Sequence, residues 1–177
     1  MLTTETLLFI LLAYLMGAFP SAVWVGKTFY KIDVREFGSG NAGATNTFRV
    51  LGKKAGIPVL IMDIFKGCLS VNYISFLTNI PESAEAVFEI KLAFGIAAVI
   101  GHLFPIYTGF RGGKGIATLL GLLIGLHAVA ALYSILVFVI VFITSKYVSL
   151  GSIISSIAFP ILVILILGST NVSLNLF

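Results

Sequence analysis

The sequence predicts an all-α, polytopic integral membrane protein, and three observations support this fold class. Of the 177 residues, 59% are hydrophobic and only 10% are charged, whereas about a quarter of the residues in a soluble domain are charged. The mean hydropathy is +1.12. The polar residues lie in short stretches between apolar runs, and these runs approach the roughly 20 residues that cross a bilayer as a helix. We therefore expect residues 1–177 to form one transmembrane domain.

The first apolar run covers residues 6–26. A secretory signal peptide begins with a basic region, but Glu5 precedes this run, so we expect a retained helix. Gly17 and Pro20 are expected to bend its far end or to pack there closely. The loop that follows, residues 27–54, holds six Lys and Arg against two acidic residues. Because positively charged loops tend to stay in the cytoplasm, we expect this loop to be cytoplasmic and the N-terminus to lie outside.

A second apolar run, residues 55–79, contains Asp63 and Lys66 three positions apart. Side chains at this spacing share one face of a helix, and ionisable groups within a span are costly. Two interpretations stay open: the two residues pair with each other, or they help to frame the polar loop. The next loop, residues 79–91, holds three Glu against one Lys and is expected outside, so residues 92–107 return to the cytoplasm.

The long apolar run of residues 116–145 is ambiguous. As one helix it is about 45 Å long, and as two helices that turn near His127 each is about 22 Å long, which is short for a span. The last expected helix, residues 149–167, is interrupted by Pro160 and leads into a polar tail at residues 168–177. With two passes over residues 116–145, the chain has about six transmembrane helices.

The first glycine-rich stretch, residues 37–56, reads FGSGNAGATNTFRVLGKKAG. Its glycines at positions 38, 40 and 43 satisfy the dinucleotide pattern G-x-G-x-x-G, but that pattern requires a βαβ unit, and no alternation of strands and helices is visible. We reject a nucleotide cofactor. Glycine-rich backbone beside cationic side chains still favours an anion, most often a phosphate. The basic balance of the chain is thus attributed to topology and anionic ligands rather than to nucleic acid.

The second glycine-rich stretch, residues 110–118, reads FRGGKGIAT. It is not a Walker A loop, because Gly115 follows Lys114 where that motif has Ser or Thr. Its glycines nevertheless precede a helix whose first N–H groups are free, and Arg111 and Lys114 add charge, so phosphate binding is favoured over a turn that merely touches lipid headgroups. His102 is expected at a helix end, and His127 at an outer turn.

Both stretches, GSGNAGATNTFRVLGKKAG and GHLFPIYTGFRGGKGIAT, resemble the bacterial acyl-phosphate:glycerol-3-phosphate acyltransferase family. Shorter segments that support the resemblance are FPSAVWVGK, DVREFGSGN, MDIFKG and KYVSLGSI. The resemblance covers residues 10–160. It implies a cell-membrane enzyme, without cofactor or metal, that moves a fatty acyl group from acyl phosphate to the 1-position of sn-glycerol 3-phosphate. It also implies a soluble enzyme that produces acyl phosphate as a partner.

By the same resemblance, Ser39, Arg49 and Lys114 are the expected catalytic residues, in a groove that faces the cytoplasm and binds both phosphates. Ser39 is expected to position the glycerol hydroxyl, and a phosphate oxygen of a substrate to take its proton. Further expected contacts to the substrates come from Gly38, Gly40, Asn41, Gly43, Thr45, Asn46, His102, Arg111, Gly112, Gly113, Gly115 and Ser152.

One departure from the family concerns the end of the chain. The family has a seventh helix and a third cytoplasmic motif of H-R-x-N type, neither of which is visible before Phe177. We therefore expect a truncated chain with poor turnover. The alternative function is a permease for a phosphorylated solute, which would require inverted repeats with binding groups near the midplane of the membrane.

Overall fold

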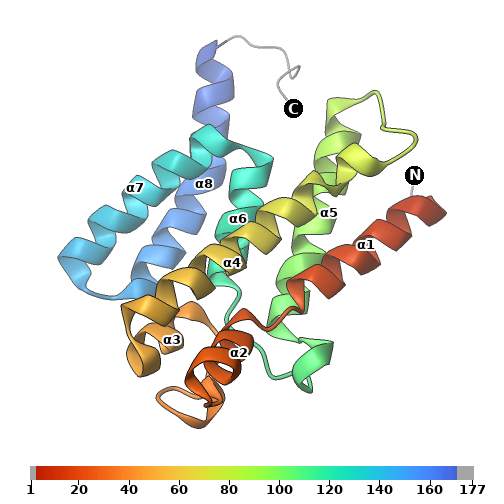
Figure 1. The fold of residues 1–177 in the computed structure, drawn as a ribbon. Coiled ribbons are helices and arrows are strands. Elements are labelled where there is room, and N and C mark those ends of the chain that lie inside the picture. Colours follow the sequence, from red (N-terminus) through yellow and green to blue (C-terminus); the bar gives the residue numbers. More distant parts are fainter. Residues whose placement is uncertain (1–2, 171–177) are drawn as a thin grey trace.

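The computed structural model describes residues 3–170, and within them it contains eight α-helices and no strand (Figure 1). The all-helical prediction is therefore confirmed for the described part of the chain. The α-helices are α1 (Thr4–Gly17), α2 (Ser21–Val25), α3 (Ala44–Leu51), α4 (Lys53–Val71), α5 (Ala84–Leu103), α6 (Ile116–Leu126), α7 (Ala128–Ser145) and α8 (Val148–Thr170). Short π or 3-10 segments lie at η1 (Gly26–Tyr30), η2 (Val34–Glu36), η3 (Asn72–Phe76) and η4 (Ile106–Thr108).

Among the described residues, four helical segments are long and apolar enough to cross a membrane: α4 with η3, α5 with η4, α7, and α8. A fifth arises if α1 and the α2–η1 segment form one span with a 40° bend. The expected single helix over residues 6–26 is thus broken. Pro20 stands at the break, immediately before α2, and it lacks the amide that would continue a helix.

The ambiguous run of residues 116–145 forms two helices, α6 and α7, rather than one. Of the two, only α7 is a candidate span, so the described residues hold four or five candidate spans rather than the expected six. His127 separates them in an extended conformation, and its Nδ1 accepts a hydrogen bond from the Ala130 amide at 3.2 Å. Because α6 has 11 residues, it is only about 16 Å long and does not reach the length of a span.

Three expected boundaries were wrong. Residues 44–51 of the expected loop form α3, because Phe48 and Leu51 pack against a buried cluster that includes α4. Helix α5 begins at Ala84 rather than at residue 92, because the Ser83 hydroxyl caps it. Helix α8 runs on through Pro160 to Thr170, since helices within a membrane protein tolerate proline. The remainder of the expected polar tail, residues 171–177, lies outside the described residues.

Glycines bring two pairs of helices into backbone contact. A methyl group on Gly121 of α6 would lie 2.0 Å from the Ile64 carbonyl oxygen of α4, and one on Gly17 of α1 would lie 2.0 Å from the Ala98 carbonyl oxygen of α5. Small residues at such crossings are typical of membrane helix pairs. The α4–α6 and α1–α5 contacts therefore fix how the loops at the helix ends face one another.

The two glycine-rich stretches lie at the same end of the bundle, as predicted. At that end a guanidinium nitrogen of Arg35 donates to the Thr108 carbonyl at 3.0 Å, which links the segment after η1 to the segment after α5. At the other end, Glu5 accepts hydrogen bonds from the amide and the hydroxyl of Thr78 at 2.9 and 2.8 Å. The N-terminal end of α1 and the loop between α4 and α5 therefore lie together, away from α2 and α3 (Figure 1).

Candidate functional site

Residues 37–43, which we call the serine loop, are shaped by Asn46 in the first turn of α3. The Oδ1 atom of Asn46 accepts hydrogen bonds from the amide and the hydroxyl of Ser39 at 2.9 and 3.1 Å. Its Nδ2 atom donates to the carbonyls of Val34 and Phe37 at 2.8 and 3.2 Å. Asn46 is 1% exposed. Its amide is occupied by the loop itself, so Asn46 holds Ser39 in place rather than facing a ligand.

The hydrogen bonds between Asn46 and Ser39 require a glycine with left-handed backbone conformation at position 38. Gly38 has φ of +62°, and a methyl group there would lie 2.4 Å from the Asn46 Oδ1 atom. Only glycine adopts this backbone conformation without strain and leaves room for the amide. The loop therefore depends on Gly38 and Asn46 together.

Residues 109–115, which we call the lysine loop, lie on the C-terminal end of α5. The Gly113 amide donates to the His102 carbonyl at 3.1 Å. A methyl group on Gly112 would lie 2.0 Å from the same carbonyl oxygen, and one on Gly113 would lie 2.1 Å from the Nε2 atom of His102. His102 therefore packs directly against Gly112 and Gly113.

The serine loop and the lysine loop contact each other directly. The Ala42 amide donates to the Gly112 carbonyl at 3.5 Å, and a methyl group on Gly43 would lie 3.9 Å from the Cα atom of Gly113. The structure thus brings together two stretches that are about seventy residues apart in the chain.

Two helix N-termini begin at this contact. Gly43 is the N-cap of α3 and Gly115 is the N-cap of α6, and neither helix start is capped by a side chain. The first amides of an α-helix have no partner within the helix, and they carry the positive end of its dipole. Two such ends side by side favour an anion.

Three cationic side chains add to this positive field. Arg49, Arg111 and Lys114 are exposed, and among the described residues none of them has an ion-pair or hydrogen-bond partner. Ser39, in the serine loop, is exposed as well. These groups are thus available to a ligand.

By contrast, the cations before the serine loop are already paired. Two guanidinium nitrogens of Arg35 donate to the two carboxylate oxygens of Asp33 at 3.0 and 2.8 Å, and Lys27 lies 3.2 Å from the same carboxylate. The hydrogen bonds from Arg35 hold the pKa of Asp33 well below its usual range. Arg35 also donates to the Thr108 carbonyl, so it links the segment before the serine loop to the segment before the lysine loop.

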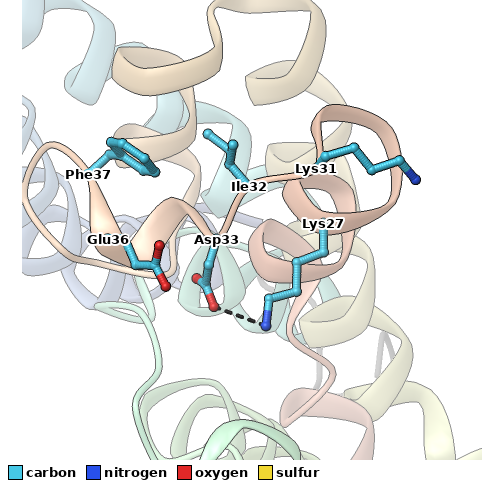
Figure 2. A pocket seen from close by; sticks show the side chains of 6 residues that line it. All are labelled: Lys27, Lys31, Ile32, Asp33, Glu36 and Phe37. Carbon is cyan, nitrogen blue, oxygen red and sulfur yellow. Dashed lines mark ion pairs between the residues drawn. The ribbon is translucent and has the colours of Figure 1, made fainter.

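A hollow of about 420 Å³ opens beside this ion-pair cluster. Figure 2 shows Lys27 directed at Asp33 while the Lys31 side chain points away from it. Because Asp33 and Glu36 line the hollow together with the lysines, its lining is of mixed charge. It is therefore less suited to a phosphate than the helix ends at Gly43 and Gly115.

Beneath the lysine loop lies a buried polar cluster that the sequence showed only in part. Of the two interpretations left open for Asp63 and Lys66, their pairing is confirmed, with Nζ and Oδ1 3.0 Å apart. The same Asp63 oxygen lies 3.6 Å from the Nδ1 atom of His102 and accepts a hydrogen bond from Ser21 at 2.9 Å. Neither Ser21 nor the contact with His102 was expected. Polar residues within the predicted spans could have indicated a buried cluster, but the sequence does not show which residues on other helices they contact.

The remaining expected site residues take different positions. Asn41 is half-buried in the serine loop, and Thr45 is exposed in the first turn of α3. Gly40 continues the serine loop with a left-handed φ of +70°. Ser152 is 5% exposed on α8 and its hydroxyl donates to the Val148 carbonyl at 2.8 Å. The recorded bond of Ser152 therefore stays within its own helix and does not join it to the two loops.

The chain matches, over residues 7–177, the model of a protein family described as glycerol-3-phosphate acyltransferase. A curated relative of that name from Enterococcus faecalis is 48% identical over 153 residues, which are 86% of this chain and 67% of the relative. Another, from Chlorobaculum tepidum, is 48% identical over 158 residues, covering 87% and 68%. The chain thus spans about two thirds of the length of these relatives.

Solved structures agree with these sequence matches. The crystal structure of PlsY (YgiH), described as an integral membrane glycerol 3-phosphate acyltransferase in its glycerol 3-phosphate form, superposes with a TM-score of 0.79 at 34% identity. The match covers 92% of this chain and 78% of that one. The lysophosphatidic acid form of the same protein gives a TM-score of 0.77.

Proposed function

The chain belongs to the glycerol-3-phosphate acyltransferase family of integral membrane enzymes, and we propose that it transfers a fatty acyl group from acyl phosphate to the 1-position of sn-glycerol 3-phosphate. The products are lysophosphatidic acid and inorganic phosphate. The observation that carries the proposal is the contact at Gly43 and Gly113, where two uncapped helix starts meet beside unpaired cations. The reaction involves two phosphate-bearing substrates, and this is a site built for anions.

The hydrogen bonding of Ser39 supports a role in orienting the acceptor. Its hydroxyl proton is donated to Asn46, so the Ser39 oxygen keeps acceptor lone pairs for the hydroxyl of glycerol 3-phosphate. An amide oxygen does not remove a proton from serine, so this geometry favours Ser39 as a positioning group rather than a nucleophile. In this proposal the glycerol oxygen attacks the acyl carbon, the bond from that carbon to the phosphate oxygen breaks, and a substrate phosphate oxygen takes the proton.

No strong base is needed for this reaction, because acyl phosphate is an activated mixed anhydride. The main tasks are to align the attacking hydroxyl and to stabilise the charge on the departing phosphate. Arg49 and Lys114, on the two sides of the contact between the loops, are proposed to hold the phosphates, with Arg111 adding to the positive field.

The activity is tested by supplying purified protein with acyl phosphate and glycerol 3-phosphate and measuring released phosphate and lysophosphatidic acid together. We expect both products in equal amounts. In proteoliposomes, uptake of glycerol 3-phosphate without release of phosphate would favour the permease instead. No inverted repeat of the kind that a permease would require is evident in the sequence.

We further propose that both loops face the bacterial cytoplasm, where a soluble enzyme that makes acyl phosphate supplies the donor, and that the N-terminus lies outside. In a variant whose native cysteine is replaced (Cys68→Ala), single cysteines at Lys31 and Tyr107 are expected to resist an impermeant thiol reagent in intact cells. A cysteine at Glu82 is expected to react, because the loop that carries it lies at the opposite end. The reverse pattern of labelling would contradict the orientation.

A further inference from the structure

Four polar side chains from three helices meet inside the bundle, directly below the lysine loop. They are Ser21, Asp63, Lys66 and His102, with exposures of 1%, 1%, 3% and 6%. Burying ionisable groups in a membrane protein is costly and often marks function, and a buried ion pair is poor evidence of a purely stabilising role. We therefore infer that the cluster has a function beyond stabilising the fold.

The two ring nitrogens of His102 face different partners. Nδ1 lies 3.6 Å from the Asp63 carboxylate, whereas Nε2 lies against Gly113, close enough that a methyl group there would come within 2.1 Å of it. The backbone of His102 is engaged by the same loop, because its carbonyl accepts from the Gly113 amide. The imidazole thus stands between a fixed carboxylate on α4 and the loop that carries Lys114.

We propose that Asp63 is a positioning residue that acts through His102: it fixes the imidazole, the imidazole fixes the backbone at Gly113, and that backbone places Lys114. The inference rests on the proposed function, since it assigns Lys114 to a substrate phosphate. Gly112 and Gly113 provide no side chains to pack, so the lysine loop depends on this support. Because Gly112 also accepts from Ala42, a displaced lysine loop also changes its contact with the serine loop.

Lys66 has a separate task within the cluster. Its Nζ atom lies 3.0 Å from Asp63 and donates to the Phe19 carbonyl at 2.9 Å. It therefore balances the carboxylate charge and is a second donor to the Phe19 carbonyl, which also accepts from the Ser21 amide at 3.0 Å. A small cavity of about 10 Å³ touches Lys66, His102, Gly112 and Gly113, so the support below the loop is tightly filled.

The test compares Asp63→Asn, His102→Gln and the double variant that carries both. Displacing a substrate-holding group by about 1 Å can cost about a hundred-fold in rate, and we expect Asp63→Asn to raise KM about ten-fold or more for one of the two phosphate-bearing substrates. The KM of the other substrate should change less than about two-fold. Because residues that act in series are not additive, Asp63→Asn should have little further effect once His102 is Gln.

Ser134→Ala is the matched control. Ser134 is a buried polar residue on α7, 2% exposed, and its hydroxyl donates only to the Ala130 carbonyl among the described residues. Its loss should alter neither KM. A lower kcat in Asp63→Asn with both KM values unchanged would mean a smaller fraction of folded enzyme, and this would overturn the positioning role.

Substitute variants and a binding measurement distinguish a failed positioning role from a protein that does not fold or does not bind substrate. Asp63→Asn leaves the Lys66 charge unpaired and could therefore fail to fold. In that case two other variants replace it: Asp63→Asn/Lys66→Gln removes both charges, and His102→Gln keeps both. The same selective rise in KM in these variants supports the inference, and its absence overturns it. The upward shift of the unfolding temperature by glycerol 3-phosphate reports binding without turnover. If the parent protein shows neither this shift nor released phosphate, the proposed function fails; if the parent shows both and the variants match it, only the positioning role fails.

Discussion

Replacing Arg49 or Lys114 by Ala is expected to lower kcat/KM for a phosphate-bearing substrate by about ten- to a hundred-fold. Both side chains are exposed, Arg49 near Gly38 of the serine loop and Lys114 within the lysine loop, and they have no ion-pair or hydrogen-bond partner among the described residues. A charge-assisted hydrogen bond to a desolvated phosphate contributes about 1.5–3 kcal/mol, and about 1.4 kcal/mol corresponds to a factor of ten. Steady-state kinetics with each substrate varied in turn gives the size of the loss.

Two control variants separate this loss from a general effect of charge or of stability. Lys54→Ala removes the same charge from an exposed position in the first turn of α4 and is expected to keep near-parent kinetics. His127→Ala removes the N-cap of α7, which costs about 1 kcal/mol of stability but should leave the kinetics almost unchanged. If both Arg49→Ala and Lys114→Ala kept near-parent kinetics, the proposal that these residues bind the substrate phosphates would be wrong.

Asn46→Ala is expected to lower the free energy of unfolding by about 2–4 kcal/mol and to abolish most activity. The change removes both donors to the carbonyls of Val34 and Phe37, and it removes the acceptor of Ser39. Each intramolecular hydrogen bond contributes about 0.5–1.5 kcal/mol net, and the change removes four of them. Unfolding in detergent, followed by circular dichroism with a denaturant titration, measures the stability change.

Two further variants at α3 show whether the hydrogen bonds cause this effect. Thr45→Ala changes the neighbouring exposed residue and should alter stability by less than about 0.5 kcal/mol. Asn46→Asp keeps an acceptor for Ser39 but loses both donations, so it should be destabilised while retaining more activity per folded molecule than Asn46→Ala. Equal stability of Asn46→Ala and the parent would contradict the role of Asn46 as the anchor of the serine loop.

Much of the architecture was predictable from local sequence. The lengths of the apolar runs predicted spans, but the run of residues 116–145 allowed either one helix or two that turn near His127. The spacing of Asp63 and Lys66 placed them on one helix face, which made their pairing one of two open interpretations. Glycines beside Arg111 and Lys114 indicated a phosphate loop before a helix, since the exposed amides follow from helix geometry alone.

The features that the sequence did not predict depend on contacts that form only in the folded chain. Residues 44–51 lie between Gly43 and Gly52 and include four polar residues, and they form α3 because Phe48 and Leu51 pack against a buried apolar cluster that includes residues of α4. Asn46 resembled a ligand contact in the sequence, yet the backbone of residues 34–39 uses its amide fully. Ser152 was expected at the site, but its recorded hydrogen bond is to its own helix.

Hydropathy, charge and backbone freedom are properties of neighbouring residues, so they were enough to predict a bundle of membrane helices with two cationic glycine-rich segments. Only the folded chain shows that Gly43 lies near Gly113, that Asp63 lies near His102, and that the His102 carbonyl accepts from the Gly113 amide. Those contacts follow from how closely α1 approaches α5 and α4 approaches α6 at their glycines. The angle and depth of such crossings are set by the packing of whole helix surfaces, which no local pattern of residues specifies.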